Sequence, residues 1–276
     1  MVVESPCDWL ILRVLQDAGV HILELPWGDD GSLDLVTLEG MLRSEPVYLV
    51  LLSSSVSLPS AVAMQPRDRL GVAKLLDQYD CWLLENDTCG ELGFKPPQAP
   101  LRDLVNPERL VVFSSFEKIL GPEAPFGYAL SRHRSGELQR QFLLRSFRLS
   151  SIRQRAIARL YQSGRIDQHL HDLRRLLREQ ASEMSLYLER HLGDQVSYRM
   201  PAGGGAFWLS STQAVDMRQV FQHLLARQVV IAPGELFSVG GLHHQHLRLS
   251  HTFHGQPNLE IALATLGEAL RQAQIT

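Results

Sequence analysis

The segment LVVFSSFEKILGP, residues 110–122, joins an apolar run to a lysine. Residues 110–115 have the composition of a buried strand in a parallel sheet. Ligands of α/β sheets bind beyond the carboxyl ends of such strands, and Lys118 stands at that place. A desolvated lysine has a lowered pKa and can form a Schiff base with an aldehyde cofactor. The alternative is a surface lysine after a strand, which the spacing alone favours.

The same pattern continues on both sides of this segment. Further strands are expected at residues 21–25, 47–55, 81–86 and 126–131, and helices at 9–18, 33–42 and 67–78. Strands that alternate with helices at this spacing indicate βαβ units and a mostly parallel sheet covered on both faces.

The pattern changes near residue 135. Helices are expected from there to His191, with a break at Gly164, followed by strands at 196–201, 206–210, 229–234 and 246–253 and by helices at 215–227 and 257–273. The glycines at 203–205 indicate a turn with close backbone approach. We therefore predict an α/β fold with a large domain (1–135), connecting helices (136–164) and a small α+β domain (165–276).

Composition limits the classes of function. The chain has 276 residues, of which 45% are apolar and 21% charged, enough for a large domain with a small one. No apolar run reaches the roughly 18 residues that span a bilayer, so no membrane contact is expected. Glu4 and Asp8 stand where a signal peptide carries basic residues, which argues against export. Cys81 is expected to be a buried thiol in a reducing compartment, the cytoplasm. The net charge of −3 predicts no nucleic-acid binding by the chain as a whole.

Two charged stretches each allow a structural interpretation and a ligand-binding one. Residues 132–178 contain twelve arginines and three acids, and we expect solvated helix faces, with a phosphate-binding patch as the alternative. His243, His244 and His246 precede Arg248. A turn of solvated histidines is expected there, because a metal ion beside an arginine is unfavourable. No metal site is predicted.

The order of these features resembles the fold-type I aminotransferases that use pyridoxal phosphate (PLP). It is most similar to the C-terminal domain of MocR-type regulators of the GntR class, in which a winged-helix DNA-binding module precedes an aminotransferase-like domain. The resemblance rests on the opening VVESPCDWL (2–10), on Gly164, His169 and Arg174 in one helix, and on PAGGGAFWL (201–209), VVIAPGELFS (229–238) and LRLSHTF (247–253). It implies PLP as cofactor, a homodimer, and DNA contact only through an N-terminal module that is not in this chain.

The resemblance also assigns roles to four residues. Lys118 matches the catalytic lysine that bonds the cofactor. Arg248 matches the arginine that holds a substrate carboxylate with its guanidinium fork. Asn86 stands where the family has the aspartate that pairs with the pyridinium nitrogen, and Thr88 stands where it has a tyrosine, so both are candidate cofactor-binding residues.

Several positions depart from the family pattern. Residues 58–61 read Leu-Pro-Ser-Ala where the family has N-P-x-G, Glu117 replaces a serine beside the lysine, and Pro125 replaces the arginine that holds the phosphate. The neutral amide of Asn86 cannot offset a pyridinium charge, and Asp87 would replace it only after a shift of register by one residue. The family's phosphate-binding turn would lie before Met1. Loss of two charge-assisted contacts predicts PLP affinity lower by about three orders of magnitude.

These observations favour one function and leave two others open. The preferred interpretation is the effector-binding domain of a MocR/GntR-type transcription regulator, with a degraded PLP site that senses PLP or a carboxylate or amino-acid ligand. The first alternative is an active PLP-dependent aminotransferase, so enzymatic activity stays an open question. The second is a dimerisation scaffold that binds no cofactor.

Overall fold

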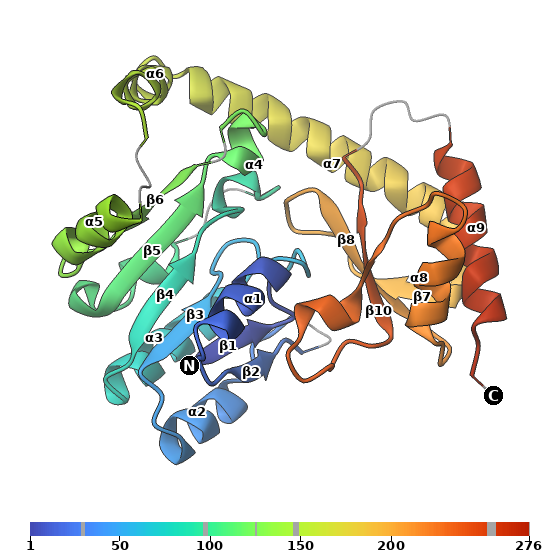
Figure 1. Ribbon diagram of the computed structural model, residues 1–276, viewed down its shortest axis with the longest axis horizontal. Coiled ribbons are helices and arrows are strands. Elements are labelled where there is room, and N and C mark those ends of the chain that lie inside the picture. The colour runs from blue at the N-terminus through green and yellow to red at the C-terminus, as the bar shows by residue number, and fades with distance from the viewer. Residues whose placement is uncertain (29–30, 96–98, 125, 146–148, 253–257, 276) are drawn as a thin grey trace.

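A computed structural model describes residues 1–28, 31–95, 99–124, 126–145, 149–252 and 258–275. Within them, the larger sheet has six strands in the order β2-β1-β3-β4-β5-β6 (Figure 1). The strands are β1 (Val2–Ser5), β2 (Leu23–Pro26), β3 (Leu49–Leu52), β4 (Trp82–Asn86), β5 (Leu110–Ser115) and β6 (Gly127–Leu130). Neighbouring strands are parallel except β6, which runs antiparallel to β5. The carboxyl ends of β1, β3, β4 and β5 therefore share one edge.

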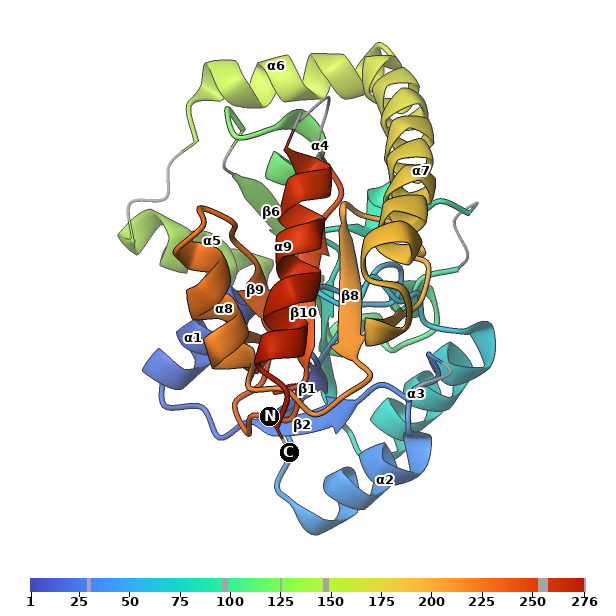
Figure 2. The ribbon, with the colours of Figure 1, turned by 90° about the vertical axis from the view of Figure 1, so that its right-hand side faces the viewer.

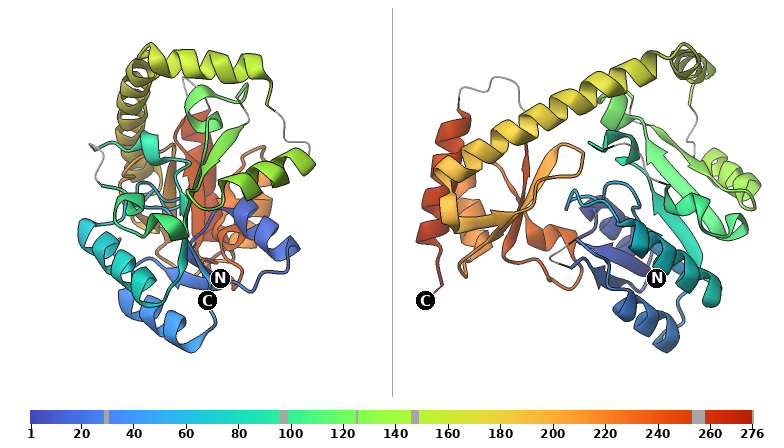
Figure 3. Two further views of the ribbon diagram at one scale, coloured as in Figure 1. Left: turned by 90° about the vertical axis from the view of Figure 1, so that its left-hand side faces the viewer. Right: turned by 180° about the vertical axis from the view of Figure 1, so that it is seen from behind.

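Helices cover both faces of this sheet. On one face α2 (Leu35–Ser44) and α3 (Pro66–Gln78) pack Leu38, Val72 and neighbouring side chains against Val50 and Leu83 (Figure 3, right). On the other face α1 (Trp9–Asp17) packs Leu12 against strand residues of β1 and β3. Burial of these aliphatic side chains contributes roughly 1.5–3 kcal/mol each.

A helical segment connects the two sheets. It comprises α5 (Ser135–Leu144), α6 (Ser151–Gln162) and α7 (Arg165–His191), whereas the short helix α4 (Glu117–Leu120) lies between β5 and β6 of the larger sheet. Gly164 has a φ of 71°, a left-handed conformation that glycine adopts without strain, and it separates α6 from α7. The 27 residues of α7 run from the region of α4 to the second sheet (Figure 1). One rigid element thus contacts both halves of the molecule.

The smaller sheet is antiparallel, with the order β7-β8-β10-β9. Its strands are β7 (Val196–Tyr198), β8 (Ala206–Ser211), β9 (Ala232–Pro233) and β10 (His246–Ser250). Helices α7, α8 (Met217–Leu225) and α9 (Leu259–Gln272) pack on it around a core that includes Phe207, Leu209 and Leu247 (Figure 2). The tip of the β7–β8 connection reaches the larger sheet through the bridge between Gly93 and Gly203.

The structure confirms the α/β class and the mostly parallel sheet, and it differs from the sequence prediction in detail. The strand Val2–Ser5 was not expected, because a run of two valines before a glutamate and a proline carries little strand signal. The region before Gly164 contains two helices, α5 and α6, rather than one. The expected strand at 229–234 shrinks to two residues. The domain boundaries at 135 and 164 stay a prediction.

Candidate functional site

A cavity of about 380 Å³ lies where the two sheets meet, and it contains both residues to which the resemblance gives the main roles. Lys118 and Arg248 line it together. The other lining residues come from the start of α1, the segments after β3 and β4, the middle of α7, and the small sheet: Asp8, Trp9, Leu10, Leu58, Pro59, Cys89, Leu92, Leu173, Leu177, Gly205, Ala232, Phe237, Ser250 and Thr252. The structure therefore places an amine and a guanidinium in one pocket.

Lys118 is held in place through its own short helix. It lies in α4, directly after β5, and Ile119 beside it is buried. The carbonyl of Ile119 is 2.6 Å from Nε2 of His169 on α7, close enough for a hydrogen bond. The sequence marked His169 only as part of a family pattern, and the structure shows that it ties α7 to the backbone next to the lysine. Lys118 itself is exposed, so the expected loss of hydration around its amine is not seen among the described residues.

Arg248 is a half-buried cation that has no partner in the described part of the chain. It lies in the middle of β10, paired with Trp208 of β8 and Ala232 of β9. Burial lowers the pKa of its guanidinium, and Cys89 and Asp8 partly offset this effect. Among the described residues its guanidinium has no hydrogen bond and no ion pair. A guanidinium in this position favours an anionic ligand, because burying a charge without a counter-charge costs free energy.

Cys89 and Asp8 are lining residues that the sequence did not indicate. Burial raises the pKa of the Cys89 thiol to about 11, against the opposing effect of Lys118 and Arg248, so it is a neutral thiol at pH 7. Asp8 caps α1 by accepting a hydrogen bond from the backbone N–H of Leu10. Each follows an ordinary structural pattern, a buried thiol and a helix cap, which explains why neither had a functional signal.

Asn86 and Thr88 are the two candidate cofactor-binding residues that the resemblance gave in addition to Lys118. Both lie outside this cavity. Oδ1 of Asn86 accepts hydrogen bonds from the backbone N–H of Thr88 (3.1 Å) and from its hydroxyl (2.6 Å). The two side chains thus close a local turn after β4. Asp87, the acid that a register shift would have used, pairs instead with Arg102 at 2.8 Å. The structure brings Lys118 and Arg248 together and leaves Asn86 and Thr88 apart from them.

Buried carboxylates lie beneath the carboxyl edge of the larger sheet. Glu4 is 1% exposed and accepts a 2.7 Å hydrogen bond from the hydroxyl of Ser53. Burial raises the pKa of Glu4 to about 7. Burial also raises the pKa of Glu85, although its bond from Ser54 and the charge of Arg102 act in the opposite direction. These groups support the edge on which the cavity is built.

The turn before β10 differs from the solvated histidine turn that the sequence predicted. His243 is half-buried, and burial lowers its pKa to about 4, so it is neutral at pH 7. Its Nε2 lies 2.9 Å from the hydroxyl of Ser5. His246 stacks on Trp208 with 5.3 Å between ring centroids, and only His244 is exposed. No group of His, Cys, Asp and Glu in the described part of the chain is arranged to hold a metal ion.

Glu24 fixes this turn to the larger sheet. Its carboxylate accepts hydrogen bonds from the hydroxyls of Ser5 and Ser238, both at 3.0 Å, and from the backbone N–H of Gly240 at 2.7 Å. The three donors come from positions that are 19 to 216 residues away in the chain. This carboxylate therefore contributes to holding the turn before β10, the strand that carries Arg248, against the larger sheet.

The residues present fit only part of PLP. An amine at Lys118 and a carboxylate-binding group at Arg248 share the cavity, which suits an aldehyde and the carboxylate of an amino acid. No described acid lines the cavity apart from Asp8, which caps α1, and the amide of Asn86 is already bonded to Thr88. Pro125, at the position of the phosphate-binding arginine, lies outside the described residues. The described side chains thus leave the ring nitrogen without a counter-charge.

Comparison with known proteins identifies relatives of two kinds. The HTH-type transcriptional regulators YjiR and YdcR of Escherichia coli are 24% and 26% identical to this chain over 273 residues, which cover 98% and 99% of the chain and 58% of each regulator. The 2-aminoadipate transaminase of Thermus thermophilus is 24% identical over 280 residues, 98% of this chain and 69% of the transaminase. The chain thus spans just over half the length of the regulators that it matches.

Solved structures share the fold. The α-aminoadipate aminotransferase LysN of Thermus thermophilus, complexed with N-(5'-phosphopyridoxyl)-L-leucine, superposes with a TM-score of 0.88 at 23% identity, over 99% of this chain and 71% of LysN. The kynurenine aminotransferase of Pyrococcus horikoshii gives 0.87 at 22% identity, over 98% of this chain and 69% of that enzyme. No helix in the described part of this chain is both long and apolar enough to cross a membrane. The model of the aminotransferase class I and II family matches residues 10–266, and the chain belongs to that family.

Proposed function

We propose that this chain is the effector-binding, aminotransferase-like domain of a MocR/GntR-type transcription regulator. In this proposal Arg248 binds the carboxylate of an amino acid or a related ligand in the cavity that Lys118 also lines. The half-buried guanidinium of Arg248, which has no partner among the described residues, is the observation that carries the proposal. DNA contact belongs to a separate N-terminal module, and the protein acts in the cytoplasm.

The regulator interpretation is supported by what surrounds the lysine. Regulators with an HTH designation align with almost the whole chain, and the side chains that would complete a catalytic PLP site are replaced or bonded elsewhere. An enzyme must stabilise its transition state better than its ground state, whereas a sensor needs only affinity that differs between two conformations. A cavity that keeps the ligand-binding arginine but lacks the ring-nitrogen acid meets the second requirement.

PLP is the cofactor that the family uses, and Lys118 is the residue that would hold it in this chain. When bound, PLP supplies an electron-withdrawing ring. Arg248 would orient a carboxylate at the far end of the cavity, and Leu173 and Leu177 of α7 would exclude water from one wall. The missing counter-charge at Asn86 predicts weak binding of PLP.

The carboxylate site is tested by melting temperatures in the presence of amino acids and of the amines that lack their carboxyl group. At least one amino acid should stabilise the wild-type chain, and its amine should not. Arg248→Gln should weaken binding by about ten- to a hundredfold, because it removes a charge-assisted contact. Arg227→Gln, which changes an exposed arginine after α8, is the matched control. An equal response of wild type and Arg248→Gln would refute the site.

The active aminotransferase is the second candidate function, favoured by the transaminases among the relatives and by the shared cavity of Lys118 and Arg248. Addition of PLP separates the two functions. A yellow absorbance band that disappears in Lys118→Ala and persists in Lys74→Ala, which changes an exposed lysine on α3, would show that the cofactor binds at Lys118. Turnover of amino acids would then establish the enzyme. If PLP produces no absorbance band and no carboxylate raises the melting temperature, the dimerisation scaffold that binds no cofactor is the interpretation that remains.

A further inference from the structure

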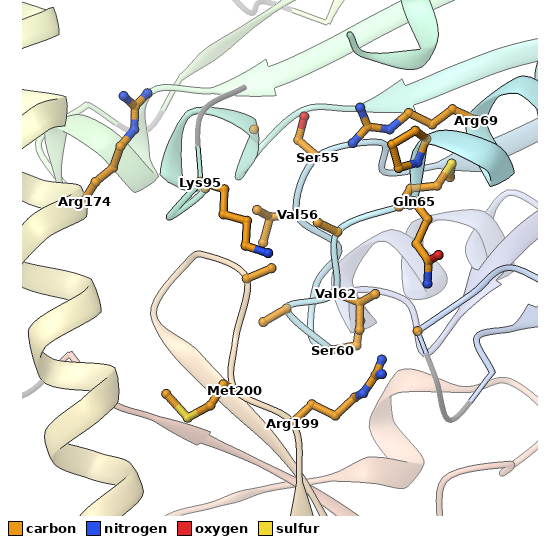
Figure 4. A pocket seen from close by; sticks show the side chains of 18 residues that line it. Ser55, Val56, Ser60, Val62, Gln65, Arg69, Lys95, Arg174, Arg199 and Met200 are labelled. Carbon is orange, nitrogen blue, oxygen red and sulfur yellow. The ribbon is translucent and has the colours of Figure 1, made fainter. Parts of the chain in front are cut away.

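A second cavity, of about 560 Å³, is also lined by the segments that follow β3 and β4 (Figure 4). Its lining residues come from these two segments, from the start of α3, from α7 and from the end of β7: Gly31, Ser55, Val56, Ser60, Ala61, Val62, Ala63, Met64, Gln65, Pro66, Arg69, Gly90, Gly93, Lys95, Arg174, Arg199, Met200 and Ala202. It shares no lining residue with the Lys118 cavity. Its volume is typical of sites for small molecules.

The charged side chains that line this cavity, among the described residues, all carry positive charge. Four cationic side chains line it, and none of the described lining residues is acidic. Lys95 extends its amine into the space between Val56 and Val62, and the guanidinium of Arg199 lies beside Ser60 (Figure 4). Lys95 and Arg199 have no ion pair in the described part of the chain. Asp29 and Asp30 precede Gly31 in the sequence and lie outside that part.

Arg69 is the buried cation of this cavity. It is 4% exposed, and it donates from its two terminal nitrogens to the carbonyls of Ala99 (2.6 Å) and Ser54 (2.8 Å). Its Nε is buried and has no hydrogen-bond partner among the described residues. Two carbonyls orient this guanidinium, and the charge of Glu85 acts on it without a direct ion pair. Burial of such a charge costs free energy, and an anionic ligand in the cavity would lower that cost.

Two further features point to an anion. The cavity lies at the N-terminus of α3, a helix of 13 residues whose first residue is Pro66 and whose cap, Gln65, makes no side-chain hydrogen bond. The dipole at a helix N-terminus favours negative charge, although Pro66 has no N–H, the N–H groups of Asp68 and Arg69 donate to the carbonyl of Gln65, and Asp68 already places a carboxylate in the first turn. The hydroxyl of Ser60 is also buried, and it has no hydrogen-bond partner among the described residues.

We propose that this second cavity binds a small phosphate monoester. Arg69 and the hydroxyl of Ser60 would bind the phosphate oxygens, and Lys95 and Arg199 would contact them from the more exposed side. A dianion with three acceptor oxygens satisfies several donors at once. A single carboxylate offers only two oxygens and one charge, so it fits this donor set less well.

Calorimetric titration of the full chain with glycerol 3-phosphate tests the proposal, with inorganic phosphate and succinate titrated in parallel at matched ionic strength. Saturable binding of glycerol 3-phosphate is expected, and Lys95→Ala and Arg199→Ala should each weaken it by about tenfold, the effect of one charge-assisted contact. Both side chains are exposed, so the variants should fold. Lys74→Ala and Arg175→Ala, which change exposed cations outside the cavity, should bind as wild type.

Three outcomes would overturn the proposal: no saturable binding of glycerol 3-phosphate, equal binding by Lys95→Ala and wild type, or tighter binding of succinate than of glycerol 3-phosphate. Arg248→Gln separates this site from the Lys118 cavity, because it should leave the affinity for glycerol 3-phosphate unchanged. A loss of that affinity in Arg248→Gln would place the phosphate in the Lys118 cavity and refute the second site. Failure of the carboxylate test at Arg248 leaves this result unaffected.

Discussion

At the scale of a single residue, Glu4 makes the stability of the fold depend on pH. Its side chain is buried at the carboxyl end of β1, and burial raises its pKa from 4.5 to about 7. The folded chain therefore binds a proton more tightly at this position than the unfolded chain does. Below pH 4.5 both states are protonated and the fold carries no penalty. As the pH rises from 4.5 to 7, the unfolded state ionises first, and stability is lost across that window.

Glu4→Gln is expected to remove this pH dependence. The amide keeps an acceptor for the hydroxyl of Ser53 but cannot ionise. Relative to wild type, the variant should gain stability with rising pH between 4.5 and 7 and keep a gain of about 3 kcal/mol above pH 7. Urea unfolding at a series of pH values measures the difference. Glu189→Gln, on the exposed surface of α7, should show the wild-type slope, and a parallel curve for Glu4→Gln would refute the raised pKa.

The sequence could identify a functional residue only where a chemically suitable side chain stands at a telling place relative to a predicted strand. Lys118 follows a buried strand and Arg248 lies within a short strand, and the structure places both on one cavity. The burial of Glu4 and Arg69 had no such signal, because it depends on neighbours such as Ser53 and Ala99 that are distant in the chain. The exposure of Lys118 agrees with the surface lysine that its spacing alone favoured.

At the scale of elements, glycines decide how closely strands approach. A Cβ added to Gly127 in β6 would lie 1.9 Å from the carbonyl oxygen of Ser114 in β5. The same addition at Gly203 would meet the carbonyl of Leu92 at 2.5 Å. The expected close approach of the 203–205 turn is thus confirmed. By contrast, a Cβ added to Gly40 in α2 would meet nothing within 4 Å.

Two alanine substitutions should therefore act in opposite directions. Gly127→Ala should destabilise the chain by about 1–3 kcal/mol, because the methyl group must push β6 from β5. Gly40→Ala should stabilise it by about 0.5–1 kcal/mol, because alanine loses less backbone entropy in a helix. Denaturant midpoints at constant slope measure both. A stabilising Gly127→Ala would contradict the close packing of these two strands.

Periodicity predicted most elements, and it failed where elements are short or depend on a partner. The apolar runs before Ser53, Asn86 and Ser115 became central strands of the sheet. The strand of Val2–Ser5 and the direction of β6 were missed or left open, because four residues carry too weak a pattern and because strand direction depends on pairing rather than on sequence.

At the scale of the whole molecule, α5 and α6 lie apart from both cores. No described residue of either helix is buried. Leu143, Leu144 and Ile152 are 50–78% exposed, and the arginines around them are exposed as the sequence predicted. Large apolar side chains that stay exposed can indicate an interaction surface. We propose that these side chains belong to the interface of the homodimer that the family resemblance implies.

Ile152→Glu combined with Leu144→Glu is expected to shift the chain from dimer to monomer, because each charge would have to be buried in the interface. Sedimentation velocity over a range of concentrations measures the shift. Ile261→Glu changes an equally exposed apolar residue on α9 and should leave the dimer intact. A dimer that survives the double substitution would place the interface elsewhere.

The contacts that unite the two sheets could not have been predicted from sequence. Glu24 reaches Ser238 and Gly240 across more than 200 residues, and nothing near Glu24 in the chain signals that pairing. The order of strands and helices predicted the fold class, while the junction of the two sheets depends on polar contacts between segments that are distant in the chain.

The segments after β3 and β4 form a thin partition between the two cavities. Val56 and Gly93 face one side of it, and Leu58 and Leu92 face the other. A ligand that displaces these segments from one side changes the volume of the cavity on the opposite side. If occupancy of one chamber alters the dissociation constant in the other by some factor, thermodynamic reciprocity requires the same factor in return. A ligand in one cavity would then change the affinity of the other cavity by way of this shared partition.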